Sequence, residues 1–106
     1  MSKIIPLDSS NYIEAALSFD GPVMIDFWAD WCNPCKALAP VIEEIAAEMP
    51  DSVRICTVDV DQNTEITRQF RVMGIPTCIF MKNGEEVQRF VNIRDKQDYI
   101  DQLNDM

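Results

Sequence analysis

The chain has 106 residues, of which 47% are hydrophobic, and this size and composition suit one domain built around one core. With 18 acidic and 9 basic residues its formal net charge is −9, and no cluster of lysine or arginine stands out, which argues against a nucleic-acid partner. Because the chain has no histidine, nucleophiles activated by histidine and metal sites that contain histidine are excluded.

Hydrophobic periodicity and turn residues divide the chain into alternating strands and helices. After a short N-terminal strand, the expected elements are a helix from Asp8 or Ser9 to about Ser18, a strand at 23–28, a helix at about 33–49, a strand at 53–60, a short helix from Asn63 or Thr64 to about Phe70, strands at 77–82 and 85–91, and a C-terminal helix that includes Tyr99 and Leu103. Asn83-Gly84 predicts a type I′ hairpin turn, because these residues adopt positive φ angles. This order predicts an α/β fold with a mixed sheet between helices on both faces.

The N-terminal sequence and the number of cysteines indicate the cellular compartment in which the protein works. Met1 to Pro6 lack the long apolar core of a signal peptide, and the apolar runs of the chain are too short to span a bilayer. We therefore expect a cytoplasmic protein with no membrane partner. Since the cytosol keeps thiols reduced, the four cysteines are not expected to form a structural disulfide framework.

The strongest chemical signal is Cys32-Asn33-Pro34-Cys35, which lies between a predicted strand and a predicted helix. Cys32 therefore falls at a helix N-terminus, where unpaired backbone N–H groups and the helix dipole favour a thiolate. The spacing lets Cys35 resolve a mixed disulfide formed at Cys32. Half of a zinc site is the alternative, but the chain has no second Cys-x-x-Cys motif.

Three further residues of the predicted strands bear on this chemistry. Asp26 lies in an otherwise apolar strand, where burial of an ionised carboxylate is costly and raises the pKa. Such a group can hold a proton, although a purely structural acid is the alternative. Cys56 and Cys78 are interpreted as buried core residues. The alternative for Cys78 is a thiol close enough to the site to react with Cys32 or with glutathione.

Motifs along nearly the whole chain resemble those of the thioredoxin family. They are Asp26-Phe27-Trp28-Ala29 followed by Trp31-Cys32-Asn33-Pro34-Cys35-Lys36, then Val58-Asp59-Val60-Asp61, Gly74-Ile75-Pro76-Thr77 and Lys82-Asn83-Gly84. The resemblance implies the thioredoxin fold, with a central mixed five-stranded sheet flanked by four helices.

The resemblance also implies an activity, the reduction of protein disulfides. It assigns Cys32 as the exposed attacking thiolate, Cys35 as the more buried resolving thiol, and Asp26 as the acid that exchanges a proton with Cys35. The implied partners are disulfide-containing target proteins and an electron donor of the thioredoxin-reductase type. No bound cofactor or metal is expected beyond the redox-active disulfide, and a monomer is the default for this fold.

A surface for substrates follows from the same resemblance. Trp31 is expected to be exposed for recognition, and Gly74, Ile75 and Pro76 are expected to contact the substrate. The Ile75-Pro76 bond is expected to be cis, which leaves the backbone of Ile75 free to pair with an extended substrate. Asn92 stands where the family has glycine, so a side chain projects where partners approach.

Other positions around the dithiol are expected to tune its redox behaviour. Asn33 replaces a glycine of the family motif, and its side chain can form a local hydrogen bond at the helix start. Pro34 and Lys36 complete the motif. Thr57 replaces a lysine found in many thioredoxins, so Asp26 lacks a cation that would favour its ionised form.

Two alternative functions remain open from the sequence. The first keeps the enzyme class but reverses its direction, giving a disulfide oxidase or isomerase. Asn33-Pro34 permits this, while the missing signal peptide argues against it. The second is a thioredoxin-like subunit that binds and stabilises a partner protein without catalysis.

Overall fold

The structure is a computed structural model and describes residues 3–106. Its elements are β1 (Ile5–Pro6), the π-helix η1 (Ile13–Leu17), β2 (Val23–Trp28), α1 (Asn33–Glu48), β3 (Arg54–Asp59), α2 (Thr64–Gln69), β4 (Thr77–Lys82), β5 (Glu85–Val91) and α3 (Lys96–Asn104). The predicted order of strands and helices is confirmed. No helix in this described part of the chain is both long and apolar enough to cross a bilayer.

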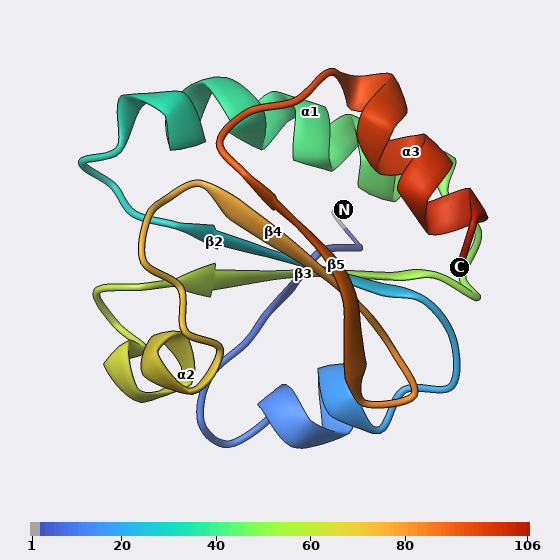
Figure 1. The fold of residues 1–106 in the computed structure, drawn as a ribbon, viewed down its shortest axis with the longest axis horizontal. Helices are drawn as coiled ribbons and strands as arrows, with labels where there is room; N and C mark the ends of the chain where they lie inside the picture. The colour runs from blue at the N-terminus through green and yellow to red at the C-terminus, as the bar shows by residue number, and fades with distance from the viewer. Residues whose placement is uncertain (1–2) are drawn as a thin grey trace.

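The strands form one mixed sheet in the order β1-β3-β2-β4-β5. At its centre, β2 pairs in parallel with β3 and antiparallel with β4. Asn83 and Gly84, which join β4 to β5, have φ angles of 55° and 80°, as the predicted hairpin turn requires. Figure 1 shows α1 and α3 over one face of the sheet and α2 and η1 over the other. The mixed sheet and its four flanking helices are therefore confirmed.

Alternation along β2 divides the core into two layers. Met24 packs in the layer beneath α1 and α3, whereas Ile25 and Phe27 pack in the layer beneath α2 and η1. Because successive strand residues point to opposite faces, Asp26 shares the α1 face with Met24. The carboxyl group thus lies in the layer that α1 covers.

The first helix is shorter than the sequence predicts. Only η1 forms in place of a helix from Asp8 or Ser9 to Ser18. Asp8 does cap a turn, since its carboxylate accepts the Ser10 N–H at 2.8 Å, but such local bonds compete with a regular helix. The element ends in a wide turn, in which the Ser18 N–H donates to the Ile13 carbonyl at 2.8 Å.

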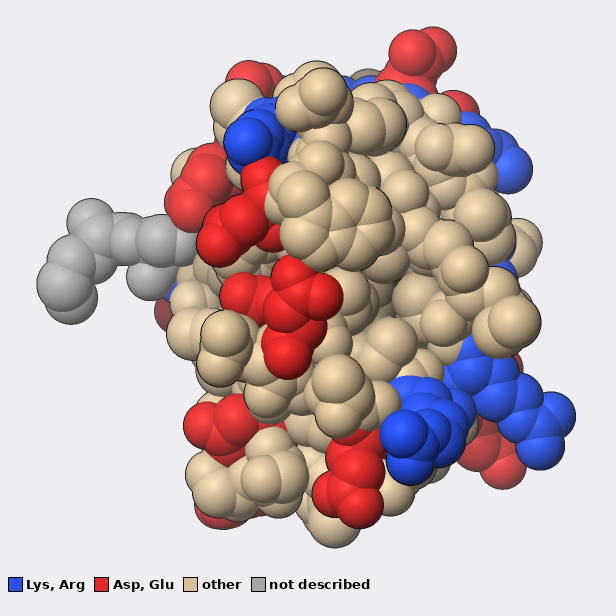
Figure 2. All heavy atoms as spheres, turned by 90° about the vertical axis from the view of Figure 1, so that its left-hand side faces the viewer, with Lys and Arg blue, Asp and Glu red and all other residues tan. Residues whose placement is uncertain are grey.

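The segments that carry the chemical motifs meet at one end of the sheet. β2 leads into Cys32, β3 ends at Asp59, and the antiparallel β4 begins just after Pro76. This end lies at the left of Figure 1 and faces the viewer in Figure 2. The fold therefore brings residues from three separate stretches of sequence into one site.

Candidate redox site

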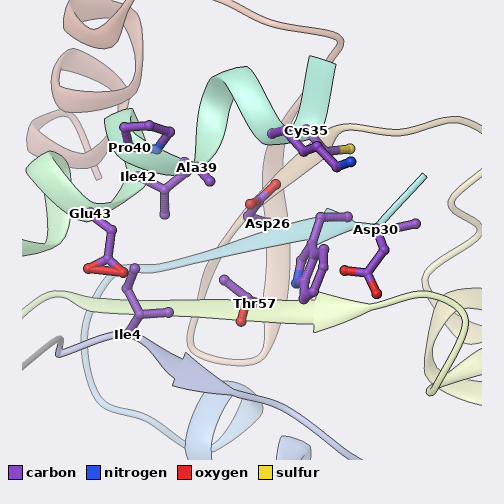
Figure 3. Close-up of a pocket in the computed structure, with 12 residues that line it drawn as sticks. Ile4, Asp26, Asp30, Cys35, Ala39, Pro40, Ile42, Glu43 and Thr57 are labelled. Carbon is purple, nitrogen blue, oxygen red and sulfur yellow. The ribbon is translucent and has the colours of Figure 1, made fainter. Parts of the chain in front are cut away.

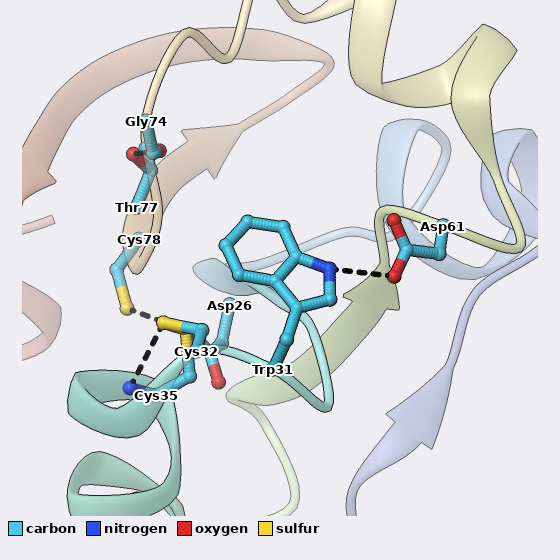
Figure 4. The surroundings of a disulfide bond; sticks show 8 residues. All are labelled: Asp26, Trp31, Cys32, Cys35, Asp61, Gly74, Thr77 and Cys78. Carbon is cyan, nitrogen blue, oxygen red and sulfur yellow. Dashed lines mark hydrogen bonds between the residues drawn. A yellow bond between two sulfur atoms is a disulfide. The ribbon is translucent and has the colours of Figure 1, made fainter.

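The site is built around a disulfide between Cys32 and Cys35, whose Cα atoms lie 5.2 Å apart. Cys32 is the N-cap residue of α1, and its Sγ accepts a hydrogen bond from the Cys35 N–H at 3.2 Å (Figure 4). Pro34 lies in the first turn of the helix, where its missing N–H leaves no bond unmade. The predicted position of Cys32 at a helix N-terminus is confirmed. In this form the two sulfurs are bonded to each other, so they are not available as thiolate ligands for zinc.

One expectation about the two cysteines is wrong for the disulfide form. Cys32 was expected to be exposed and Cys35 more buried, but each residue is only 4% exposed. Closure of the disulfide holds the Cys32 side chain over the first turn of α1, where it packs with Ala29 and Ile75. Position, rather than exposure, distinguishes the two residues: Cys32 caps the helix, and Cys35 lines a cavity beside Asp26.

Asp26 is buried in the middle of the sheet, with 4% of its surface exposed. Thr57 on β3 and Cys78 on β4 are its cross-strand neighbours. Burial raises the pKa of Asp26 to about 7, and a hydrogen bond from the Cys78 thiol opposes that rise. The raised pKa predicted from the sequence agrees with this result. A group with this pKa can both take up and release a proton near neutral pH.

Cys78 is a partner of Asp26 that the sequence did not reveal. Its Sγ donates to Oδ1 of Asp26 at 3.7 Å. Cys78 and Cys56 are both buried, as predicted, and burial raises the pKa of the Cys78 thiol well above its usual range and that of Cys56 to about 12. Both thiols are therefore neutral, and Cys78 is too enclosed for the predicted alternative of an accessible thiol.

A cavity of about 550 Å³ lies between α1 and β3 and reaches both Asp26 and Cys35 (Figure 3). Its walls are mainly apolar. Thr57 lines it opposite α1, and the short side chain leaves the space beside Asp26 unfilled. Asp30, Lys36 and Glu43 also line the cavity. Within residues 3–106, no group of three or more cysteine or carboxylate side chains is placed to hold a metal ion.

The loop before β4 lies over the disulfide. The Ile75-Pro76 bond is cis, as the resemblance implied. In the described part of the chain neither the N–H nor the C=O of Ile75 has a hydrogen-bond partner. Thr77 Oγ1 donates to the Gly74 carbonyl at 2.6 Å, and the Asn92 N–H donates to the Pro76 carbonyl at 2.8 Å. These bonds fix the loop while they leave the backbone of Ile75 available.

The rim of the site is apolar and exposed. Trp31 is 67% exposed, as predicted, and its Nε1 donates to Oδ2 of Asp61 at 2.8 Å (Figure 4). Trp28 is half-buried and packs against the disulfide. Met73 is 96% exposed, and sequence reasoning missed it, since hydrophobicity alone assigns methionine to the core.

Two positions expected to tune the dithiol lie on the outside of α1. Asn33 is exposed, and its side chain has no hydrogen-bond partner within residues 3–106, so the local bond expected there is not formed. Cys32 Sγ takes the capping position instead. Lys36 is exposed at the edge of the cavity, and its N–H donates to the Cys32 carbonyl at 3.1 Å.

Comparison with known proteins agrees with this geometry. The Thioredoxin family model matches residues 3–105. The chain belongs to the thioredoxin family. It is 41% identical over 105 residues to a thioredoxin of Mycobacterium bovis, and the match covers 99% of this chain and 90% of that relative. It is also 41% identical over 100 residues to the thioredoxin of Alicyclobacillus acidocaldarius, with 94% of each protein covered.

A solved structure extends the similarity to three dimensions. The crystal structure of the Malassezia sympodialis thioredoxin Mala s 13 superposes with a TM-score of 0.86 at 30% identity and covers 99% of this chain and 91% of that one. Family membership and the disulfide at the start of α1 identify the chain as a thiol-disulfide oxidoreductase.

Proposed function

We propose that this thioredoxin-family protein works in the reducing direction, as a cytoplasmic protein-disulfide reductase. The observation that carries the proposal is the Cys32–Cys35 disulfide at the N-terminus of α1, beside a buried carboxyl group whose pKa is about 7. These features supply a stabilised nucleophile, a resolving thiol and a proton acceptor in one place. The electrons reside in the sulfur pair, so we expect no bound cofactor.

The first step is an attack by the reduced Cys32 on a target disulfide. The N–H groups of the first turn of α1 and the helix dipole stabilise its thiolate. Cys32 Sγ forms a bond to one target sulfur, the target S–S bond breaks, and the other target sulfur leaves as a thiolate. The free backbone groups of Ile75 pair with the extended target segment, and the exposed ring of Trp31 packs against it.

The second step is resolution by Cys35. Its thiol gives a proton to Asp26 across the shared cavity, and the resulting thiolate attacks Cys32 Sγ. The bond between Cys32 and the target breaks, and the target sulfur that was bonded to Cys32 leaves as a thiolate and takes up a proton. Two electrons have then passed from the dithiol to the target, and the Cys32–Cys35 disulfide has formed.

Return to the dithiol requires an external reductant, and we propose a thioredoxin reductase. A relative from Mycobacterium leprae, 40% identical over 102 residues, is named as a bifunctional thioredoxin reductase and thioredoxin; the match covers 96% of this chain and 22% of that protein. Its combined name supports pairing with such an enzyme. We expect the present chain to act as a monomer.

The direction of the reaction is tested by the midpoint potential of the couple. The protein is equilibrated in defined dithiol buffers, its free thiols are alkylated, and the disulfide is mapped by mass spectrometry. We expect a potential near the thioredoxin family value of about −270 mV. A value nearer about −180 to −120 mV would favour the oxidase or isomerase function instead.

The binding-subunit alternative is tested with cysteine variants. Cys35→Ser should accumulate a mixed disulfide between Cys32 and a target protein, because the resolving thiol is missing. The matched variant Cys56→Ser removes a buried thiol outside the site and should not trap targets. If Cys32→Ser/Cys35→Ser retains the protein's role while reduction is lost, the enzymatic proposal fails.

A further inference from the structure

A groove connects the redox site to α2. Two hollows of about 360 and 710 Å³ share Val72 and Met73 in their linings. The smaller one reaches the redox site, and the larger one follows α2 and the loop after it. We call this surface the α2 groove; it extends from Trp31 and Ile75 at one end to Arg68 and Arg71 at the other.

The far end of the α2 groove carries the positive charges of Arg68 and Arg71, which form no ion pair or side-chain hydrogen bond within residues 3–106. Arg68 lies in the last turn of α2 and Arg71 follows the helix, and both are exposed. Arg89 differs, because Glu86 binds its Nε and a terminal nitrogen at 2.7 Å each. Unpaired arginines are notable in a chain with 18 acidic and 9 basic residues.

The two ends of the groove have opposite charge. At the Trp31 end, Asp61 holds the indole, and Asp30 is exposed next to the ring in sequence. Figure 2 shows this face with acidic side chains gathered left of its centre and a group of basic side chains at its lower right, with mostly uncharged surface between them, although a few acidic side chains also lie beside the basic group. A ligand segment that follows the groove is therefore attracted at its distal end if it carries negative charge.

We propose that the α2 groove binds an extended segment of the target protein that has apolar residues near the reacting cysteine and acidic residues beyond them. This inference rests on the proposed function, because the segment belongs to the disulfide substrate. Met73 offers a flexible apolar contact along the groove, and the guanidinium groups of Arg68 and Arg71 pair with the acidic side chains. The α2 groove thus selects targets by charge.

The test compares reduction of peptide disulfides in which apolar residues adjoin the cysteine and one position beyond them is glutamate, glutamine or lysine. The readout is the ratio of kcat/KM for the glutamate peptide to that for the lysine peptide. At low ionic strength we expect a ratio of about two- to fivefold, typical of exposed charge pairs. The ratio should approach one in Arg68→Gln/Arg71→Gln, and it should also fall as salt screens the charges.

A matched control is Lys3→Gln/Lys82→Gln, which changes the net charge by the same amount, from −9 to −9 − 2 = −11. Lys82 ends β4 at the end of the strand remote from Pro76, and Lys3 pairs with Asp51. The control should keep the parent ratio. The single variant Arg68→Gln should lower the ratio in part. It leaves position 71 unchanged, where a φ of 55° makes a substitution more able to disturb the backbone.

Two results would overturn the proposal: a parent ratio near one, or an equal loss of the ratio in the lysine control. Either would leave the proposed function intact, since reduction of the glutamine peptide measures that function separately. If the glutamine peptide is not reduced at all, the proposed function fails and the charge selectivity falls with it.

Discussion

At the scale of single residues, the site depends on one carboxyl group enclosed in an apolar layer. Burial raises the pKa of Asp26 from 3.8 to about 7. A shift of this size means that ionising Asp26 costs roughly 4 kcal/mol more in the folded protein than in the unfolded chain. The cost is consistent with a functional group, because an apolar residue at this position would avoid it.

The pH dependence of stability should report this cost. Between about pH 4 and pH 7 the folded protein keeps a proton that the unfolded chain releases, so the parent loses stability as the pH rises through this range. Asp26→Asn should remove that fall and be more stable than the parent at pH 8 by about 2–4 kcal/mol, with little difference at pH 4. Urea denaturation of the disulfide form measures both values.

The same substitution separates a functional from a structural role. If Asp26 accepts the proton of Cys35, Asp26→Asn should lengthen the lifetime of the mixed disulfide at neutral pH, as rapid-quench alkylation can record. The exposed variant Asp20→Asn is the control and should change neither lifetime nor stability. A faster or unchanged resolving step in Asp26→Asn would contradict the proton-transfer role.

The side chain at position 57 should affect how easily Asp26 ionises. Thr57 is the cross-strand neighbour of Asp26, and both line the cavity of about 550 Å³, which has room for a longer side chain. Thr57→Lys should lower the pKa of Asp26 by about 1–3 units, because a nearby cation favours the carboxylate. Carboxyl carbon chemical shifts give the titration. Thr57→Met fills similar space without charge and should not lower the pKa; an equal decrease there would contradict the electrostatic explanation.

At the scale of elements, each reacting group is delivered by a different segment. The start of α1 carries the disulfide, β2 carries Asp26, and the loop before β4 carries Ile75 and Pro76. The sheet register aligns Asp26 with Cys78 and brings these segments together. The site therefore requires the whole sheet, although its main motif is local in sequence.

This difference explains how much of the site the sequence could predict. The start of α1 and the Asn83-Gly84 turn depend on neighbouring residues, so local patterns predicted both. The hydrogen bond from Cys78 to Asp26 depends on the register between β2 and β4, which a pattern within one strand does not contain. The burial of Cys32 in the disulfide form likewise depends on packing from other segments.

The loop after β5 offers a test of backbone conformation at the site. Asn92 has a φ of 75°, and its N–H donates to the Pro76 carbonyl. Asparagine tolerates this left-handed conformation better than alanine does. Asn92→Ala should therefore lower the free energy of unfolding by about 1 kcal/mol, whereas Asn92→Gly should be neutral or slightly stabilising. Urea denaturation decides, and equal stability of the two variants would show that the loop rearranges.

At the scale of the whole molecule, acidic residues outnumber basic ones by 18 to 9. The net charge is −9, while the salt bridges within residues 3–106 use only Lys3, Arg89 and Lys96 as cations. Exposed pairs contribute about 0.2–1 kcal/mol each, and salt weakens them. Salt also weakens the repulsion among the remaining carboxylates, which favours the compact state.

Added salt should therefore stabilise the protein at neutral pH. Raising sodium chloride from about 0.01 M to about 0.15 M shortens the screening length from about 30 Å to about 8 Å. We expect the Tm at pH 7 to rise by about 2–5 °C, since about 1 kcal/mol moves the Tm of a domain this size by 4–8 °C. Near the isoelectric point, about pH 4.2, the net repulsion vanishes and the rise should disappear. Potassium chloride should act equally, because screening depends on ionic strength alone; a Tm that falls with salt at pH 7 would mean that the ion pairs dominate.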